Sequence, residues 1–284
     1  MKKAILTVFI LLAAASAAGF SFETQKKAAI IDLSGTITPS QSTGLTATSG
    51  ITPEQVRNLN QRAKSQGADA IIYEINSGGG AVVASKEVKR AIEDVKLPTV
   101  CRMRDVAASG GYLISLGCDR IVADSSTLTG SIGVKSSYIQ YAGLMEKHGL
   151  NYINISAGGM KEVGNPFMNA SKQEKQLLQE KVDIIQQNFL KMVEKERNLT
   201  ESQMKNVSSG APFLGVEAKK LGLVDRLGGR DTAVNVTENL TGSKIQTFEV
   251  EKASSFNILS LLTADLNIGN FLEFSAPFRS SIGY

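Results

Sequence analysis

The chain has 284 residues, enough for one large domain or two small ones, and its 42% hydrophobic and 20% charged content is that of an ordinary globular protein. The formal net charge is only +4, and the chain has no Lys/Arg run, so it lacks the electrostatic pattern of a nucleic-acid-binding protein. One histidine and two cysteines are too few for a structural zinc, haem or iron–sulfur site, so we expect no metal or cofactor.

The N-terminal segment 1–22 has the pattern of a membrane-targeting sequence. Two lysines precede a run without charge from Ala4 to Phe22, which is apolar at its centre and rich in Ala at its end. A basic start followed by an apolar run directs a chain to a membrane translocon. A run of about 19 residues is long enough for a retained single-pass anchor, with the body of the chain on the extracytoplasmic side. The small residues Ala15 and Ala17 would equally suit a cleaved signal peptide and a secreted protein.

From residue 28 onward, predicted strands and helices alternate. A buried strand at 28–33 is followed by an uncharged loop at 34–50, and then by a helix that begins with a capping box of Thr52 and Gln55. The further predicted strands are 70–75, 99–103, 120–123 and 150–155, and the further predicted helices are 81–94, 109–117, 138–147 and 172–197. This alternation predicts an α/β domain built on a mainly parallel sheet.

The body of the chain has no obvious internal boundary. No linker-like composition divides 28–230, so we expect one domain there and a C-terminal extension at 231–284. The tail 254–284 is rich in Leu and Phe and has three charged residues. Because such a tail is costly to expose to water, we expect it to pack on the domain, on a neighbouring subunit or on the membrane surface.

The two cysteines allow two interpretations. Outside the cytoplasm Cys101 and Cys118 could form a disulfide. Cys118, however, ends the apolar segment 112–117, where a small packed side chain is common. From this context we expect two buried thiols, with the disulfide as the alternative.

Two glycine-rich turns follow predicted strands. The turn at 78–80 lacks a dinucleotide-binding glycine, because position 83 is Val83, and the chain lacks a phosphate-binding Gly-Lys-Ser/Thr motif. The turn is therefore either a simple tight turn or a cradle for an oxyanion. The second turn places Ser109 at the start of a helix, where Gly110 could donate its N–H to a tetrahedral oxyanion. Serine is also a common helix cap, so a purely structural role is the alternative.

A nucleophilic serine needs a base. The single histidine, His148, follows a charged helix just before a glycine, which is typical of a surface imidazole. A lysine that loses its proton on burial is the other choice, and most lysines here lie in charged helical surroundings. Lys161 differs, because it lies in the glycine-rich loop 157–166.

Several spaced motifs together point to one family. They are NSGGG at 76–80, VAASGGY at 106–112, TGSIGV at 129–134, GMK at 159–161 and AKKLGLVDRLG at 218–228. In this order they resemble the signal peptide peptidase A family of serine peptidases over roughly residues 28–230, in its short single-domain form. The resemblance implies a Clp/crotonase-like α/β fold with repeated ββα-type units, no cofactor or metal, and a Ser/Lys dyad in place of a histidine.

By position, the resemblance implies a role for five residues. Ser109 matches the nucleophile, Lys161 the general base, and Ser131 a serine that holds the lysine. Gly110 and Gly79 match the oxyanion donors. The residue before Gly79 is a glycine where the family usually has proline, which loosens this turn.

The resemblance also implies a function. The expected activity is that of a membrane-associated serine endopeptidase that cleaves remnant signal peptides and other hydrophobic, unfolded peptide segments, and that self-associates into a homo-oligomer. Because the lysine must lose its proton, the expected activity rises toward alkaline pH. Two alternatives are a catalytically silent membrane scaffold and an acyl-CoA enzyme on the same fold, neither of which requires Ser109 or Lys161.

Overall fold

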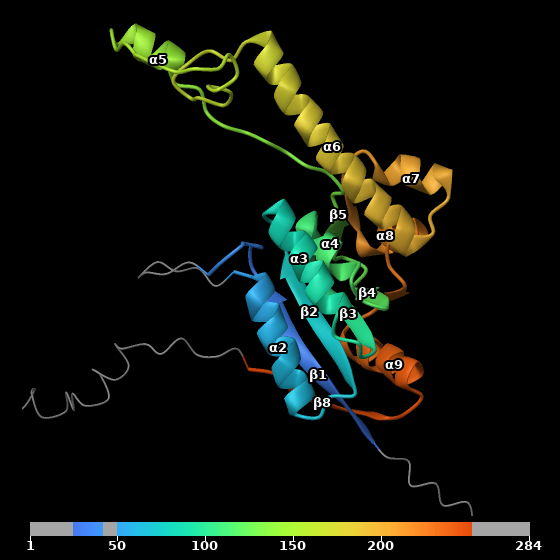
Figure 1. Ribbon diagram of the computed structural model, residues 1–284. Coiled ribbons are helices and arrows are strands. Elements are labelled where there is room, and N and C mark those ends of the chain that lie inside the picture. Colours follow the sequence, from blue (N-terminus) through green and yellow to red (C-terminus); the bar gives the residue numbers. More distant parts are fainter. Residues whose placement is uncertain (1–24, 42–49, 252–284) are drawn as a thin grey trace, which may run out of the picture. The chain divides into compact units, whose positions relative to one another are not determined.

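The computed structural model describes residues 25–41 and 50–251 (Figure 1). The predicted targeting segment at 1–22 and the apolar tail at 254–284 lie outside the described residues. Among the described helices, none combines the length and the apolar character needed to cross a bilayer. The first compact unit of the chain ends at Val250.

The described residues form one eight-stranded sheet in the order β6-β5-β3-β2-β1-β8, with β4 beside β3 and β7 beside β4. The strands are β1 (Lys26–Ser34), β2 (Ala70–Ser77), β3 (Thr99–Ala108), β4 (Arg120–Ala123), β5 (Leu128–Gly130), β6 (Pro212–Leu214), β7 (Arg226–Leu227) and β8 (Ile245–Glu249). All pairs are parallel except β5 and β6, which are antiparallel. The predicted α/β class is confirmed, and the sheet is mixed.

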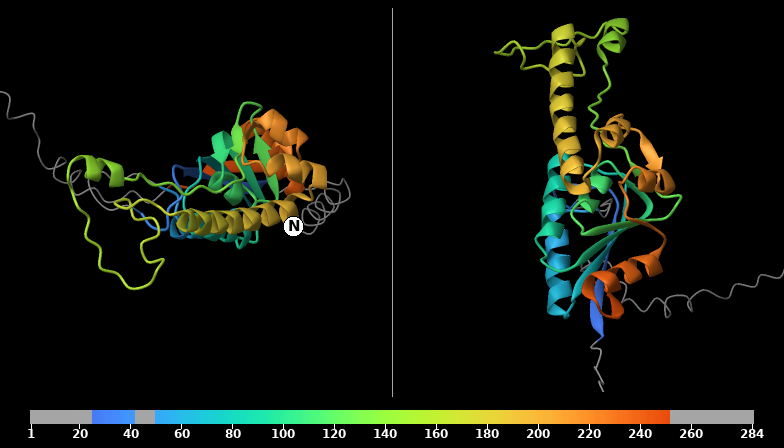
Figure 2. Two further views of the ribbon diagram at one scale, coloured as in Figure 1. Left: turned by 90° about the horizontal axis from the view of Figure 1, so that it is seen from above. Right: turned by 90° about the vertical axis from the view of Figure 1, so that its right-hand side faces the viewer.

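Helices cover both faces of this sheet (Figures 1 and 2). They are α2 (Pro53–Ser65), α3 (Val82–Glu93), α4 (Gly110–Ser115), α5 (Ala142–Lys147), α6 (Lys172–Arg197), α7 (Glu201–Val207), α8 (Gly215–Lys220) and α9 (Arg230–Thr241). Alternate residues of the central strands enter two separate cores, as the two-residue period of a strand requires. The larger core packs against α2, α3 and α4, and the smaller one packs against α9.

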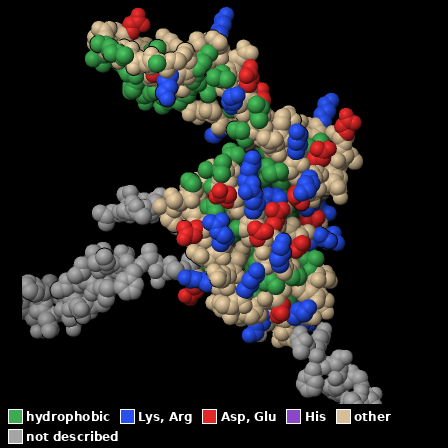
Figure 3. Space-filling model, viewed as in Figure 1, with side chains coloured by type: hydrophobic (Ala, Val, Ile, Leu, Met, Phe, Trp, Pro, Cys, Tyr) green, Lys and Arg blue, Asp and Glu red, His purple; other side chains and the backbone are tan. Residues whose placement is uncertain are grey.

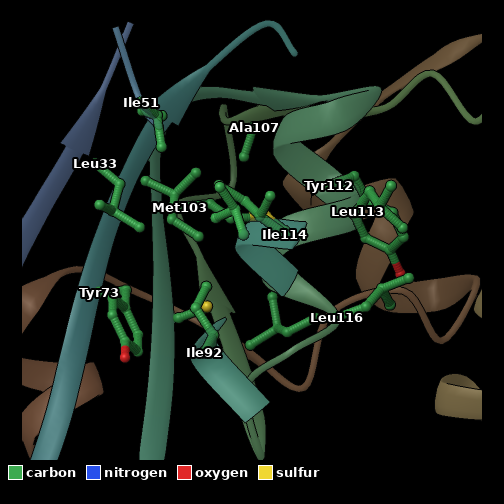
Figure 4. Close-up of a cluster of buried hydrophobic side chains, with 14 of the residues drawn as sticks. Leu33, Ile51, Tyr73, Ile92, Met103, Ala107, Tyr112, Leu113, Ile114 and Leu116 are labelled. Atoms are coloured by element: carbon green, nitrogen blue, oxygen red, sulfur yellow. The ribbon is translucent and has the colours of Figure 1, made fainter. Parts of the chain in front are cut away.

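The larger core immobilises α4, the helix that follows the predicted nucleophile. Tyr112, Leu113 and Ile114 of α4 are buried among residues of β2, β3 and α3 (Figure 4). The Tyr112 hydroxyl donates a hydrogen bond to the Leu223 carbonyl oxygen at 3.1 Å. Burial raises the pKa of Tyr112, so this phenol stays neutral and keeps its donor role. The result is a short helix fixed on several sides.

A disulfide joins Cys101 of β3 to Cys118, just beyond the end of α4. The expectation of two buried thiols is therefore wrong. The two Cα atoms are 5.7 Å apart, which is within the ordinary range for a disulfide. The apolar surroundings of Cys118 did predict its packing, but a linear sequence does not show that the end of α4 returns to β3.

The predicted strand at 150–155 is also wrong, because these residues have no regular secondary structure. Ile153 is 83% exposed and Ile155 is 95% exposed, and no described strand pairs with them. Without a partner for its backbone, an apolar run cannot form a strand. The predicted domain end at residue 230 needs correction as well, since β8 pairs with β1 and the compact unit extends to Val250.

Helix α6 has the predicted bounds and the predicted capping box of Ser171 and Glu174. Its buried residues are Phe189, Leu190 and Val193, so only its C-terminal part packs on the core. Arg197 at its end forms an ion pair with Asp225 at 2.9 Å and donates to the Gly222 carbonyl oxygen. The N-terminal part of α6 projects from the sheet together with α5 (Figure 2).

Candidate active site

The candidate site lies where β3 ends and α4 begins. Ser109 has φ 53° and ψ −117°, a conformation that is rare for a residue with a side chain. Its N–H donates to the Gly130 carbonyl oxygen at 2.8 Å, because β5 pairs with the end of β3. The side chain is half-buried, and within the described part of the chain its hydroxyl has no hydrogen-bond partner. A strained, anchored serine with a free hydroxyl has the form of a nucleophile.

Backbone donors converge next to this serine. Gly110 is the first residue of α4, and no described group accepts a hydrogen bond from its N–H. The backbone of Gly79 comes so close that a Cβ on Gly79 would lie 2.7 Å from the Gly110 nitrogen and 3.2 Å from the Ser109 Cβ. The Gly79 N–H donates to Ser77 Oγ at 3.1 Å. Gly110 is therefore a free donor beside Ser109, whereas Gly79 would have to exchange its partner.

Ser131 also lies in this region. It follows β5 directly, one residue after the Gly130 that accepts the Ser109 N–H. Its own N–H donates to the Ala211 carbonyl oxygen at 3.1 Å, its φ is 49°, and its side chain is half-buried. Four of the five predicted residues, Ser109, Gly110, Gly79 and Ser131, are thus placed by three neighbouring strand ends.

Lys161 is not placed with them. It is exposed and lies in a series of turns between α5 and α6, where its N–H donates to the Gly158 carbonyl oxygen at 3.1 Å. We call residues 135–171 the arm. The arm lies beyond the N-terminal end of α6, away from α4 (Figures 1 and 2). His148 is the exposed C-cap of α5 on the same arm, which confirms the surface position that its sequence context predicted.

A hollow adjoins Ser109, and the sequence pattern did not predict its walls. Most of the side chains that line it are apolar, and they come from α3, α4, α6 and the residues just before the arm. The lining residues are Gly80, Val82, Ser85, Lys86, Ser109, Gly110, Leu113, Gly133, Val134, Ile185, Phe189 and Met192. Ile185, Phe189 and Met192 have the helical spacing of one stripe, but their spacing alone does not show that the stripe faces the serine. The described residues contain no group of three or more His, Cys, Asp or Glu side chains that could hold a metal ion.

Comparisons with known proteins show the family of this chain. The family model of Peptidase family S49 matches residues 91–244, more than half of the chain. A protein of Synechocystis sp. that is named as a protease is 32% identical over 225 residues, which cover 78% of this chain and 77% of that protein. A protein of Enterococcus faecium that is named as the signal peptide peptidase SppA is 33% identical over 180 residues, which cover 62% of this chain and 52% of that protein.

A solved structure supports the fold independently. The 1510-N membrane-bound stomatin-specific protease, as a mutant in complex with a substrate peptide, superposes with a TM-score of 0.54 at 16% identity. The match covers 85% of this chain and 99% of that one. The chain spans between 41% and 64% of the length of three of the curated relatives that it matches.

Proposed function

Because the chain belongs to Peptidase family S49, a family of serine peptidases, we propose that it is a serine endopeptidase with Ser109 as its nucleophile. The observation that carries this proposal is the junction of β3 and α4. There a strained serine with a free hydroxyl adjoins the unpaired N–H of Gly110 and an apolar hollow. The mainly parallel sheet also supports the finer expectation of a Clp/crotonase-like fold.

In the proposed reaction, Ser109 Oγ attacks the carbonyl carbon of a peptide bond and its proton passes to the base. The carbonyl oxygen becomes an oxyanion that the Gly110 N–H stabilises, and Gly79 joins it if its N–H leaves Ser77. The intermediate collapses to an acyl-enzyme as the amine leaves with a proton from the base. Water then attacks the ester, gives up a proton to the same base and releases the carboxylic acid, so that Ser109 regains its proton.

We propose Lys161 as the base and Ser131 as the residue that holds it. In the described structure the arm carries Lys161 away from Ser109, so catalysis requires that the two meet. Either the arm moves toward its own α4, or the arm of a second copy reaches the site. In both cases the lysine would leave water for a protein environment, which favours the neutral form that can accept a proton.

The arm supports the proposal of self-association into a homo-oligomer. It exposes an unusual number of large apolar side chains (Figure 3). They are Tyr138, Ile139, Tyr141, Leu144, Leu150, Tyr152, Ile153, Ile155, Met160, Phe167 and Met168. Exposed apolar residues that are this concentrated mark a surface for contact with another molecule.

The proposed substrates are remnant signal peptides and other hydrophobic, unfolded peptide segments. The mostly apolar lining of the hollow supports this, since an extended peptide could insert an apolar side chain beside Ser109. The targeting pattern at 1–22 supports a membrane-associated protein with its peptidase domain on the extracytoplasmic side, or a secreted one. The Cys101–Cys118 disulfide agrees with that location, because disulfides persist mainly outside the cytoplasm.

The test is hydrolysis of an internally quenched hydrophobic peptide by the wild type and by the Ser109→Ala and Lys161→Ala variants, between pH 6 and 10. We expect a rising alkaline limb for the wild type and no activity above background for either folded variant. Activity of the Ser109→Ala variant would rule out Ser109 as the nucleophile. No cleavage by the wild type at any pH would overturn the peptidase and favour a silent scaffold.

Mixing the two inactive variants shows how Lys161 reaches Ser109. If the arm of one copy serves the serine of another, the mixture regains part of the wild-type activity, because one site then has both residues. If each arm serves its own chain, the mixture stays inactive although the wild type is active.

A further inference from the structure

One charged side chain lines the hollow beside Ser109, and the proposed mechanism does not use it. Lys86 lies in the second turn of α3 and is half-buried. The other residues that line the hollow are Gly, Ser or apolar residues, so Lys86 is the single charge among the described lining residues.

The ammonium group of Lys86 has no partner within the described part of the chain, since it forms neither an ion pair nor a hydrogen bond there. Lys89, one turn further along α3, provides a direct contrast. It is buried and forms ion pairs with Glu93 and with Glu196 of α6. Its Nζ lies 3.1 Å from the Glu196 carboxylate. Lys89 therefore serves the packing of α3 on α6, whereas Lys86 lines the hollow and no described anion neutralises its charge.

We propose that Lys86 determines which charge the hollow accepts on the peptide side chain that enters it. This inference rests on the proposed peptidase function. A side chain that enters this small apolar hollow loses part of its water, so its interaction with the ammonium is stronger there than at an open surface. A carboxylate gains an ion pair, an uncharged side chain loses little, and a lysine or arginine meets like charge with no anion to offset it.

The residue concerned is the one that supplies the scissile carbonyl. Its carbonyl oxygen has to reach the Gly110 N–H, and Gly110 itself lines the hollow. The side chain on the adjoining Cα is therefore the one that the hollow can take. Lys86 thus acts as a specificity residue: it makes a generally apolar site tolerate glutamate and reject basic residues at the cleavage position.

The experiment compares three quenched peptides that differ only at this residue, which is Leu, Glu or Lys. For the wild type we expect kcat/KM for the Glu peptide to exceed that for the Lys peptide by about tenfold or more at low salt. We expect Lys86→Met to remove most of this difference while it retains cleavage of the Leu peptide, and Lys86→Glu to invert it. Arg90→Met is the matched control, because it removes one positive charge from α3 outside the hollow and should leave the preference unchanged.

Two results would overturn the inference. If Lys86→Met keeps the full Glu over Lys preference, another group sets it. If Lys86→Met abolishes cleavage of the Leu peptide and removes the alkaline limb of the pH profile, Lys86 takes part in proton transfer instead. Binding of the same peptides to the Ser109→Ala variant, followed by fluorescence anisotropy, separates this inference from the proposed function. A charge preference in Kd that Lys86→Met removes supports it even if the wild type cleaves nothing, and equal Kd values for the three peptides contradict it.

Discussion

At the scale of single residues, the most informative position is Ser109, because its backbone is strained. Its φ of 53° with ψ of −117° lies in a region that glycine enters readily and other residues avoid, at a cost of about 1–3 kcal/mol. The N–H bond to Gly130 and the burial of Tyr112 in the helix that follows hold the serine there. Backbone strain at this serine is a sign of function, because a glycine at the same position would adopt the conformation without strain.

This strain leads to a prediction that is independent of catalysis. We expect Ser109→Gly to be more stable than Ser109→Ala by about 1 kcal/mol. Glycine removes the backbone strain, and the greater conformational entropy of glycine in the unfolded chain offsets only part of this stabilisation. Both variants lack the nucleophile, so both should be inactive. Urea unfolding at pH 7 measures the difference. An alanine variant as stable as the glycine variant would show that the conformation costs little.

At the scale of elements, the disulfide closes a loop that contains the end of β3, Ser109 and α4. Its sequence separation is 17 residues, for which loss of the cross-link is expected to cost about 3 kcal/mol. We therefore expect the double variant Cys101→Ala, Cys118→Ala to unfold at clearly lower urea concentration than the wild type. Reductant should bring the wild type close to the variant and leave the variant itself unaffected. If reductant changes both equally, its effect does not come from this bond.

The capped helices α6 and α2 differ in how much their N-caps contribute to the stability of the whole unit. The Ser171 hydroxyl accepts the Glu174 N–H at 3.2 Å, but the N-terminal part of α6 is not packed on the core. Thr52 accepts the Gln55 N–H at 3.1 Å in α2, which has buried residues on one face from its first turn to its last. We expect Ser171→Ala to lose hydrogen-exchange protection only in the first turns of α6, with an almost unchanged Tm. Thr52→Ala is the matched control. It should lower the free energy of unfolding of the whole unit by about 1 kcal/mol, and the Tm should fall accordingly.

The same contrast shows which elements the sequence could predict. Local signals were sufficient for α2 and α6, because the capping residues and the apolar stripe lie in or next to the helix itself. The predicted capping box forms in full at α6, whereas at α2 only the bond from the Gln55 N–H to Thr52 Oγ1 is present. The strands β1 to β4 were predicted because they are apolar runs, and they are apolar because both of their faces are buried in the core. The short strands β5 and β6 were missed, since they exist only through pairing with distant residues. The run at 150–155 was mispredicted for the opposite reason, because it has strand-like residues but no partner.

The site follows the same rule. The positions of Ser109 and Gly110 could be predicted, because a serine and two glycines directly after a strand indicate a turn into a helix. Ser131 and Gly79 were predicted from the spaced motifs. The hollow could not be predicted, since its walls combine α3, α4 and the C-terminal part of α6. The distance between Lys161 and the sheet could not be predicted either, because an arm that leaves the core has no signature in a single sequence.

At the scale of the whole molecule, Ser109 and the arm are separated. The proposed site is therefore complete only after the arm moves or after a second copy contributes its arm. The serine and its donors are built into the core, whereas the proposed base lies on a segment with many exposed apolar side chains. Contact of these side chains with another protein surface would bury them and could bring the lysine to a serine in the same event. Activity should then be coupled to the state of the arm.

Acidic pH acts on the whole molecule through two carboxylates that are held in ion pairs, Glu74 and Asp225. Burial alone would raise the pKa of Glu74, but hydrogen bonds and charges from Arg230 and Arg102 hold the pKa of Glu74 below its ordinary value. Burial alone would also raise the pKa of Asp225. The hydrogen bonds and the charge of Arg197 outweigh this effect, so the pKa of Asp225 is lowered as well. A carboxyl whose pKa is lower in the folded state binds fewer protons there than in the unfolded chain.

The predicted consequence is a loss of stability in acid. The contribution of these carboxylates is fully present above their unfolded pKa values and disappears as the pH falls through their folded values, so Tm should decline increasingly below about pH 4.5. Glu74→Gln cannot titrate there. It should be about 3 kcal/mol less stable at pH 7, since it leaves two arginines without their buried partner, and its Tm should decline less between pH 5 and 3. Glu146→Gln, at an exposed position on α5, should retain the wild-type decline. Parallel curves for Glu74→Gln and the wild type would mean that other carboxylates control acid unfolding.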